Sequence, residues 1–475
     1  MLQRRAVLQT FLKSAALFAL RPFAGASLPD ESQLIALRPG AGAPVEIPDE
    51  FIGLGYEMSS VATPALLSAA NREYVALVKG LGAKGVLRVG GIVADYTRFD
   101  PQAAAQTDPH NTVIDQASLR QFAGFLEATG WRALWSLNLA QGSLADAMTE
   151  AQAVDAALGA HLLAFELGNE VENYARGSHP FRPASWSYAA WRSQFREWSA
   201  AIRRALPRAR FAAPDTASSV EWVESLAKDA DGEVHLLTTH YYRTDQRHGS
   251  ADQLLTPDPR LHDVLTRLRA ASQHSRIPWR MCEANSFPGG GLPGVSDTIV
   301  GALWTLDFML RLAAQGCAGV NIETGVNQLG FLSSYSPIRT DAPHPFAGIP
   351  YYGMLAFAWA GKGCTQVLPV DVDLRAMNVS AWGLGASGKP RSVVVVNRER
   401  SQEVRVGLRG LAMGKATVLR LTAPAPESTS GATFGGSPIG PDGHWSPSSK
   451  EEPRGEILTV PPLSAAVVRA MEERR

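Results

Sequence analysis

The sequence predicts an α/β protein: a closed (β/α)8 TIM barrel of parallel strands with an accessory antiparallel β-sandwich. Three observations support this prediction. Short apolar runs alternate with helical patterns through residues 49–360, eight of these runs end in or beside polar residues, and beyond Gly361 short strands are separated by Gly-, Pro- and Ser-rich turns. Strands separated by helices form parallel units, and eight such units close into a barrel.

The expected barrel strands share a short apolar body and a polar or glycine-rich tip. They are residues 51–57, 86–91, 133–138, 163–170, 210–215, 234–242, 278–285 and 319–323. A TIM barrel presents its functional side chains at the carboxyl ends of its strands. The polar residues at these tips are therefore the first candidates for a site.

Two of the intervening helices carry aromatic stripes. Leu119, Phe122, Phe125 and Leu126 fall at helical spacing before Gly130, and a second stripe precedes Pro207: Trp191, Phe195, Trp198, Ile202 and Leu206. A sugar-stacking platform is one interpretation of these rings. Their period of 3.6 residues favours packing against the barrel, because such an apolar face has to be buried.

The remaining segments are assigned by composition. Residues 1–26 resemble an export signal, with Arg4-Arg5, an apolar run over 15–20 and the small residues 24–26, by either the general or the twin-arginine route. We therefore expect a periplasmic or secreted protein. Residues 27–48 are expected to add strands to the sandwich formed by 361–475. The Gly-, Pro- and Ser-rich stretch 423–455 is expected to be a surface excursion with little order.

Composition excludes several classes of protein. The 45 basic and 45 acidic residues cancel, so nucleic acid is not an expected partner. No later apolar run reaches the length needed to span a bilayer. No cofactor motif or Cys/His cluster is present, so neither a cofactor nor a metal is expected. Cys282, Cys317 and Cys364 are expected to be buried thiols, with a single Cys317–Cys364 bridge as the alternative.

Two glutamates stand at the tips of the fourth and seventh expected strands. Glu170 ends the run Leu163-Ala164-Phe165-Glu166-Leu167-Gly168-Asn169-Glu170, and Glu283 lies near the end of Pro278-Trp279-Arg280-Met281-Cys282-Glu283-Ala284-Asn285. Retaining glycoside hydrolysis needs two such carboxyl groups about 5–5.5 Å apart. We predict that Glu170 is the acid/base and Glu283 the nucleophile. Either glutamate alone would more simply be a surface carboxylate; the pair at matching strand ends favours catalysis.

Several motifs together resemble glycoside hydrolase family 79, the heparanase and β-glucuronidase family. They are Leu167-Gly168-Asn169-Glu170, Met281-Cys282-Glu283, the run 289–298 with its three glycines and Ser-Asp-Thr, and Leu87-Arg88-Val89-Gly90-Gly91. The resemblance extends from about Phe51 to the last strand. It implies a retaining enzyme that acts on β-linked glucuronides in an oligo- or polysaccharide, with the sandwich beside the barrel.

The resemblance also implies individual roles. Tyr242 is expected to hydrogen-bond the nucleophile and His240 to reach the substrate. Glu57 and Asn169 match groups that hold sugar hydroxyls. The backbone amides of Gly289 and Gly290 and the phenol of Tyr335 match donors to the glucuronate carboxylate; glycine allows a close approach of backbone N–H groups to an anion. At another strand tip, Asn138 is a further candidate for a substrate hydroxyl.

Four positions depart from the family pattern. Val171 replaces the proline that often follows the acid/base, which should matter little. Ile92 stands where a small polar residue normally follows the two glycines, Pro288 replaces an aromatic hydroxyl, and Glu323 adds a carboxylate at the end of the eighth strand. An inward-pointing, charged Glu323 would repel glucuronate. The sugar is therefore either glucuronic acid, a modified glucuronide such as the 4-O-methyl derivative, or a neutral sugar such as a xyloside or glucoside. An exported carbohydrate-binding protein without activity is the third possibility, which the matched glutamates disfavour.

Three further residues near the tips are assigned supporting roles. Arg88, among apolar neighbours, is expected to pair with a carboxylate near the nucleophile, because an unpaired buried charge is unstable. Asp215 is expected either to be structural or to support the residues that contact the substrate, and Asn285 to orient the loop that follows Glu283.

Overall fold

The computed structural model describes residues 34–178, 180–230, 232–325, 331–372, 377–411, 413–453 and 456–471. The expected export signal, residues 1–26, lies outside these ranges. Among the described helices none has both the length and the hydropathy required to cross a membrane.

Eight parallel strands form the barrel, and each coincides with one of the predicted runs. In spatial order they are β8 (Leu162–Leu167), β7 (Arg132–Leu137), β4 (Val86–Gly90), β3 (Ile52–Glu57), β12 (Val320–Glu323), β11 (Trp279–Asn285), β10 (Leu236–Tyr242) and β9 (Ala212–Thr216). The ring is closed between β8 and β9, where Phe165 N donates to Arg210 O at 2.9 Å. The predicted fold class is thus confirmed.

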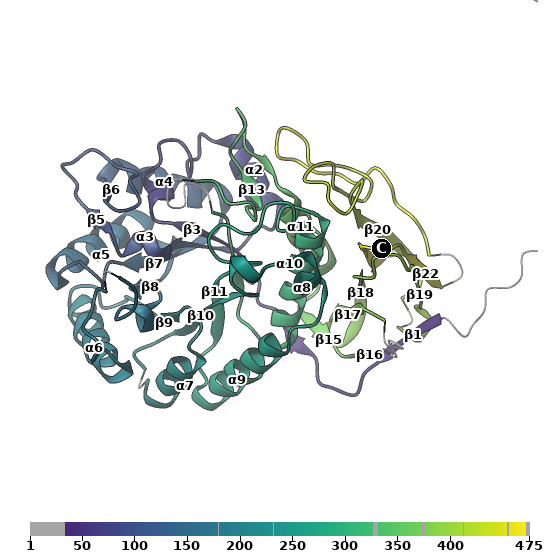
Figure 1. The fold of residues 1–475 in the computed structure, drawn as a ribbon, viewed down its shortest axis with the longest axis horizontal. Helices are drawn as coiled ribbons and strands as arrows, with labels where there is room; N and C mark the ends of the chain where they lie inside the picture. The colour runs from purple at the N-terminus through teal and green to yellow at the C-terminus, as the bar shows by residue number, and fades with distance from the viewer. Residues whose placement is uncertain are drawn as a thin grey trace, which may run out of the picture. The chain divides into compact units, whose positions relative to one another are not determined.

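Helices lie around the outside of the strands (Figure 1). The longer ones are α2 (Arg72–Gly80), α4 (Gln116–Thr129), α5 (Leu144–Leu158), α6 (Tyr188–Ala205), α7 (Val220–Asp229), α9 (Pro259–Ser275), α10 (Ile299–Ala314) and α11 (Ile349–Gly361). The short ones are α1 (Ser59–Ala62), α3 (Gly91–Ala94), α8 (Ala251–Leu255) and the 3-10 turns η2 (Gly159–His161), η3 (Val171–Asn173), η4 (Gln246–His248) and η5 (Arg409–Leu411). Two short strand pairs lie in the connections: β5 (Thr97–Phe99) with β6 (Thr112–Ile114), and β13 (Ile338–Arg339) with β14 (Phe346–Ala347).

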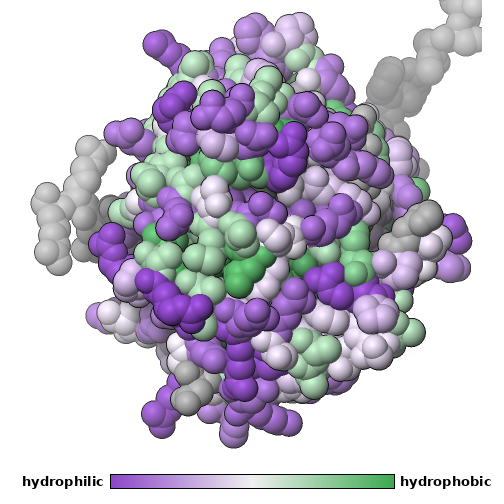
Figure 2. Space-filling model, turned by 90° about the vertical axis from the view of Figure 1, so that its left-hand side faces the viewer, coloured by the Kyte–Doolittle hydropathy of each residue, from purple (hydrophilic) through white to green (hydrophobic). Residues whose placement is uncertain are grey.

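Local sequence sets the helix ends. Asp115 caps α4 by accepting from Ser118 N, and Gly130 ends the same helix in the left-handed conformation. The aromatic stripes of α4 and α6 are buried against the barrel, as the spacing predicts: Phe122, Phe125, Trp191 and Phe195 have no exposed surface. They therefore belong to the core and not to a sugar-binding surface. On the face shown in Figure 2, hydrophilic side chains surround smaller hydrophobic areas.

The remaining strands form two antiparallel sheets. The four-stranded sheet runs β16 (Val370–Val372), β1 (Leu34–Pro39), β19 (Val404–Gly407), β22 (Ile457–Val460). The seven-stranded sheet runs β2 (Val45–Glu46), β15 (Gln366–Leu368), β17 (Val379–Ala386), β18 (Lys389–Asn397), β23 (Ser464–Ala470), β20 (Ala416–Thr422), β21 (Thr433–Phe434). Strands from residues before the barrel thus pair with strands that follow it.

Strand β18 is buried on both faces. Val393 and Val395 belong to the core between the two sheets, whereas Val394 and Val396 belong to the large core of the barrel. Alternate side chains of a strand point to opposite faces. This explains why β18 carries a continuous run of valines in place of an alternating pattern.

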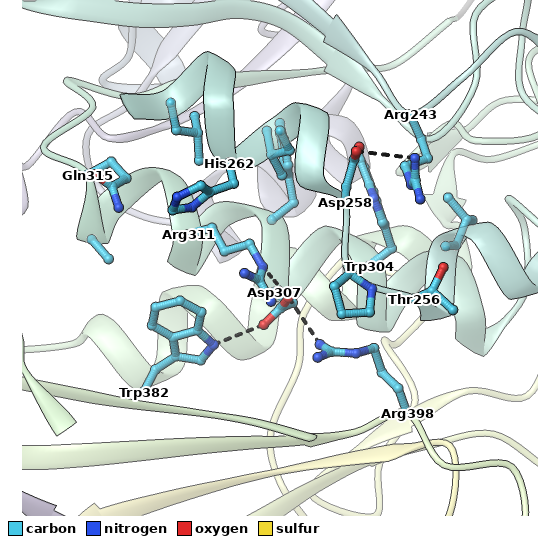
Figure 3. A pocket seen from close by; sticks show the side chains of 16 residues that line it. Arg243, Thr256, Asp258, His262, Trp304, Asp307, Arg311, Gln315, Trp382 and Arg398 are labelled. Carbon is cyan, nitrogen blue, oxygen red and sulfur yellow. Dashed lines mark hydrogen bonds and ion pairs between the residues drawn. The ribbon is translucent and has the colours of Figure 1, made fainter. Parts of the chain in front are cut away.

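Asp307, on α10, connects the barrel to the larger sheet (Figure 3). Its Oδ1 accepts from Ser380 Oγ at 2.5 Å and from Trp382 Nε1 at 2.9 Å. Its Oδ2 is 2.7 Å from Arg311 Nε and 3.0 Å from Arg398 Nη1. The two guanidinium groups outweigh the effect of burial, so the pKa of Asp307 is held well below its usual range.

Two expectations about the rest of the chain are resolved. Residues 423–453 contain little regular structure but are fixed by packing: Trp445 stacks on Phe434 with ring centroids 5.2 Å apart, and Ile439 N donates to Tyr352 Oη on α11. The segment therefore has the little regular structure that was expected, and the bond to Tyr352 joins it to α11. Cys317 and Cys364 are free thiols, and so is Cys282, which leaves the alternative of a bridge unsupported.

Candidate functional site

Glu170 and Glu283 meet at the carboxyl ends of the barrel strands. Glu170 follows β8, Glu283 lies within β11, and one carboxylate oxygen of each, together with a ring nitrogen of His240, lie within 4.8 Å of one another. The Glu170 side chain is 32% exposed and that of Glu283 9% exposed. Both carboxyl groups are thus close together, with Glu170 the more open to solvent.

Glu283 is held on both sides by donors. Arg88 Nη1 lies 2.7 Å from its Oε2, and Tyr242 Oη donates to its Oε1 at 2.8 Å. The bond expected of Tyr242 is therefore present. Because each oxygen of this carboxylate accepts a hydrogen bond, its orientation is fixed. A fixed orientation is what a nucleophile requires.

Arg88 is the centre of a buried polar network. Its Nε lies 3.0 Å from Glu166, and its Nη2 lies 2.8 Å from Asn169 Oδ1 and 2.6 Å from Asp215. The Arg88 side chain has no exposed surface. The expected pairing of this arginine with a carboxylate beside Glu283 is confirmed, and it extends to two more carboxylates.

His240 joins the two glutamates to Asp215. Its Nδ1 is 3.2 Å from Glu170 and 3.8 Å from Glu283, and its Nε2 is 3.0 Å from Asp215. Burial lowers the pKa of His240, but the charges of Glu283 and Asp215 outweigh it and raise the pKa well above its ordinary value. The ring nitrogens of His240 thus lie within hydrogen-bonding distance of carboxylates on both sides. The expected contact of His240 with the substrate stays a prediction.

The backbone around Glu170 is unusual. Glu170 has φ +48° and ψ +46°, a left-handed conformation that is uncommon for a residue with a side chain. Its N–H donates to Asp215 O at 2.8 Å, which fixes this turn to the end of β9. Strained residues of this kind concentrate at functional sites.

Several other predicted residues surround the pair. Glu57 is 3% exposed and accepts from Val93 N at 2.9 Å. Asn169 contacts Arg88, as described, and so orients its amide within the network. The ring of Tyr335 is buried, with its centroid 6.4 Å from that of Tyr242.

The glycine run after β11 presents unused donors. Gly289 and Gly290 have φ of +68° and +90°, so both favour glycine. Gly290 O accepts from Ser334 N at 2.7 Å and from Ser334 Oγ at 2.8 Å. Among the described residues no acceptor binds the N–H of Gly289 or Gly290.

Asn138 does not join this group. Its amide nitrogen donates to Thr97 O at 2.8 Å, and its oxygen accepts from Gln141 N and Gly142 N at 2.9 and 3.2 Å. The side chain thus holds the loop after β7, and these bonds use one of the two N–H donors of its amide. The role of Asn138 toward a sugar hydroxyl stays a prediction.

Ile92, Pro288 and Glu323 lie at or shortly after the carboxyl ends of β4, β11 and β12. Ile92 is 42% exposed and Pro288 is partly buried, and neither side chain can donate a hydrogen bond. Glu323 is 1% exposed, ends β12, and pairs in register with Gly55 of β3. Asn285 Nδ2 donates to Glu323 O at 2.8 Å, so it ties β11 to β12.

Two members of the network were not predicted from the sequence. Glu166 is buried on β8, accepts from Ser136 Oγ at 2.9 Å and from Arg88, and has its pKa raised to about 7, first by burial and then by Asp215. Cys282 Sγ donates to Asp215 at 2.8 Å. The signal for Glu166 was a charged residue inside an apolar strand, four positions before Glu170.

Two triads are compact enough to contact a single ion: Glu170, His240 and Glu283, and Asp215, His240 and Cys282. In the first triad Nδ1 of His240 faces Glu170 and Glu283, and in the second its Nε2 faces Asp215. His240 thus connects the carboxyl groups of Glu170 and Glu283 to Asp215.

No protein-family model matches the chain. The chain is 26% identical over 354 residues to a β-glucuronidase of Aspergillus niger, covering 66% of this chain and 64% of that protein. It is 26% identical over 332 residues to a β-glucuronidase of Neurospora crassa, covering 59% and 57%. The chain thus spans less than two thirds of the length of these relatives.

Solved structures show the same fold. A 4-O-α-L-rhamnosyl-β-D-glucuronidase from Fusarium oxysporum, in complex with Rha-GlcA, superimposes with a TM-score of 0.74 at 20% identity, covering 92% of this chain and 99% of that chain. An α-L-arabinofuranosidase from Thermotoga maritima gives 0.65 at 15% identity, with the same coverage. The barrel and its sandwich are therefore shared with glycosidases of more than one substrate.

Proposed function

We propose that the protein is a retaining glycoside hydrolase that cleaves β-linked glucuronic acid, or a modified glucuronide such as 4-O-methylglucuronide, from glycans. The observation that carries this proposal is the approach of Glu170 and Glu283 to within 4.8 Å. Retaining enzymes place their two carboxyl groups about 5–5.5 Å apart, whereas inverting enzymes leave room for a water between them.

In the proposed double displacement, Glu283 attacks the anomeric carbon while Glu170 protonates the leaving oxygen. Glu170 then takes a proton from water, which attacks the glycosyl-enzyme and releases the sugar with retained configuration. Arg88 and Tyr242 hold Glu283 in line for attack. His240 and Asn173 contact the two oxygens of Glu170, at 3.2 and 3.4 Å, and orient it toward the leaving group.

Three features support glucuronate as the sugar. The N–H groups of Gly289 and Gly290 are available to an anion, and we propose that Tyr335 adds a phenolic donor. We assign Glu57 and Asn169 to sugar hydroxyls, by the resemblance to glycoside hydrolase family 79. The aligned relatives are both named β-glucuronidases, and the structural neighbour from Fusarium oxysporum is a glucuronidase with Rha-GlcA bound.

Ile92 and Pro288 favour a second candidate, a retaining β-glycosidase for neutral sugars such as xylosides or glucosides. Neither side chain supplies a polar group where the family normally has one. We further propose that residues 1–26 direct export, so that the enzyme meets its glycan outside the cytoplasm.

The experiment that tests the proposal measures hydrolysis of p-nitrophenyl β-glycosides by residues 27–475: the glucuronide, 4-O-methylglucuronide, glucoside, galactoside and xyloside. Preference for the glucuronides supports the proposed sugar. Preference for a neutral sugar supports the second candidate, and no hydrolysis of any substrate contradicts both.

Two substitutions test the assigned roles. Glu283→Gln should abolish turnover, whereas Glu170→Ala should regain part of its activity with azide or with an activated leaving group. Glu197→Gln, an exposed carboxylate on α6, is the matched control and should retain full activity. Wild-type activity of Glu283→Gln on an unactivated glycoside would refute the mechanism.

A further inference from the structure

Glu323 is a buried carboxyl group that the proposed mechanism does not use. Its Oε1 accepts from Gly325 N at 3.3 Å, and its Oε2 is buried without a hydrogen-bond partner among the described residues. A Cβ atom at Gly55 would overlap this Oε2. Glycine on β3 therefore makes the space in which the carboxyl group lies.

The surroundings of Glu323 are acidic. The titratable groups that face it are Glu57 and Tyr56 on β3, Tyr74 on α2, Arg88 on β4, Tyr242 on β10 and Glu283 on β11. Burial raises the pKa of Glu323 well above its usual value, the charges of Glu283 and Glu57 raise it further, and Arg88 opposes them. Arg88 already forms ion pairs with Glu166, Asp215 and Glu283. Its single positive charge is therefore outweighed by these carboxylates and does little to stabilise a fourth.

We propose that Glu323 is a positioning residue that remains a neutral carboxylic acid beside Glu283, and that its neutrality lets the site accept an anionic sugar. This inference rests on the proposed function, and it names Glu323 as the residue whose neutral form allows the site to bind the negatively charged glucuronate. In the neutral form the carboxyl group keeps its proton and adds no charge next to Glu57 and Glu283. In the ionised form it would add a further negative charge beside Glu57 and Glu283, and this charge would repel an anionic sugar at the site.

Glu323→Gln tests the proposal because an amide has the shape of the protonated acid and cannot ionise. The measurement is the binding of D-glucuronate to both proteins by calorimetry over the whole pH range in which both stay folded, with methyl β-D-glucoside as the uncharged probe. Wild-type affinity for glucuronate should fall roughly tenfold or more as Glu323 ionises. The variant should show a smaller fall, and the uncharged probe should show little difference between the proteins.

His240 and the other titratable groups are present in both proteins, so the difference between the two pH dependences reports Glu323. Equal pH dependence in wild type and Glu323→Gln would overturn the role of Glu323 and leave the proposed function intact. Failure of both proteins to bind glucuronate at any pH, together with no hydrolysis of glucuronides, would refute the proposed function instead.

An infrared difference spectrum provides a measurement that needs no sugar. Wild type minus Glu323→Gln should contain the carbonyl band of a protonated carboxylic acid at pH 7, and titration of the wild type alone should remove this band at high pH. Glu197→Gln should give no such band. Its absence for Glu323 would overturn the proposal even if the variant binds sugar poorly or folds less well.

Discussion

Arg88 Nη1 lies 2.7 Å from Glu283 Oε2, so a fully buried guanidinium fixes the proposed nucleophile to the inside of the barrel. The same guanidinium contacts Glu166 and Asp215. The orientation of Glu283 is thus set by a cation that three strands share.

Arg88→Met should destabilise the protein by about 3–5 kcal/mol, because removing one partner leaves buried carboxylates without a counter-charge. Arg88→Lys keeps the charge but not the planar fork, so we expect a smaller loss. Urea denaturation measures both. Arg267→Gln is the control: its exposed pairs with Glu221 and Glu224 should be worth less than about 1 kcal/mol. A change as small as that in Arg88→Met would contradict the central role of this arginine.

Tyr242→Phe removes one hydrogen bond to Glu283 and nothing else from the network. A hydrogen bond to a charged group contributes about 1.5–3 kcal/mol, so kcat should fall roughly 10- to 100-fold. Steady-state kinetics on an activated glycoside, with thermal denaturation as a check of folding, tests this. Tyr188→Phe, which loses a bond to Asp229 outside the barrel, should retain its rate.

Glu150 gives a pH dependence that is independent of catalysis. This buried residue of α5 accepts from Trp135 Nε1 at 2.8 Å, and burial raises its pKa to about 7. The folded state thus holds a proton that the unfolded chain releases near pH 4.5, so the stabilisation is complete below that pH and disappears as the pH rises through about 7. Glu150→Gln should gain stability relative to wild type between pH 5 and 8, by up to about 3 kcal/mol. Melting temperatures of both proteins at pH 5 and at pH 8 measure this gain. Glu127→Gln, at an exposed site, is the control, and an equal change of its melting temperature would exclude Glu150 as the cause.

Asp307→Ala should destabilise the contact between α10 and the larger sheet by about 3–5 kcal/mol, since Arg311 and Arg398 lose their common partner. Asp252→Ala is the control because its pair with Arg400 joins α8 to the segment after β18 at an exposed position. Chemical denaturation should separate the two variants clearly. Equal stability of both would show that the buried network contributes no more than a surface ion pair.

The sequence was sufficient to predict the eight barrel strands, because a strand covered by helices is a short apolar run whatever its neighbours. It also placed Glu170 and Glu283 correctly at the strand ends, since their position follows from the strand itself. The role of Asn138 could not be decided in this way. An amide at a strand tip can bind a sugar, its own loop or both, and its bonds to the loop depend on the backbone of residues 139–142.

The interior of the barrel was the least predictable part. Barrels are usually filled by branched apolar side chains. Here Arg88, Glu166 and Asp215 lie within it, and none has more than 1% exposed surface. Each looks like an isolated charge in the sequence, because Arg88 contacts Glu166 and Asp215 across separations of 78 and 127 positions.

The position of β1 has a consequence for biogenesis. This early strand lies between β16 and β19, and its Leu37 pairs in register with Val372, so its partners are synthesised only after the whole barrel. A growing or translocating chain therefore has to keep β1 unpaired until its last quarter emerges, whereas the barrel can form from sequential units. The smaller sheet can therefore be completed only after the barrel strands have been synthesised. Deletion of β1 would leave β16 and β19 with unpaired edges, which promote aggregation.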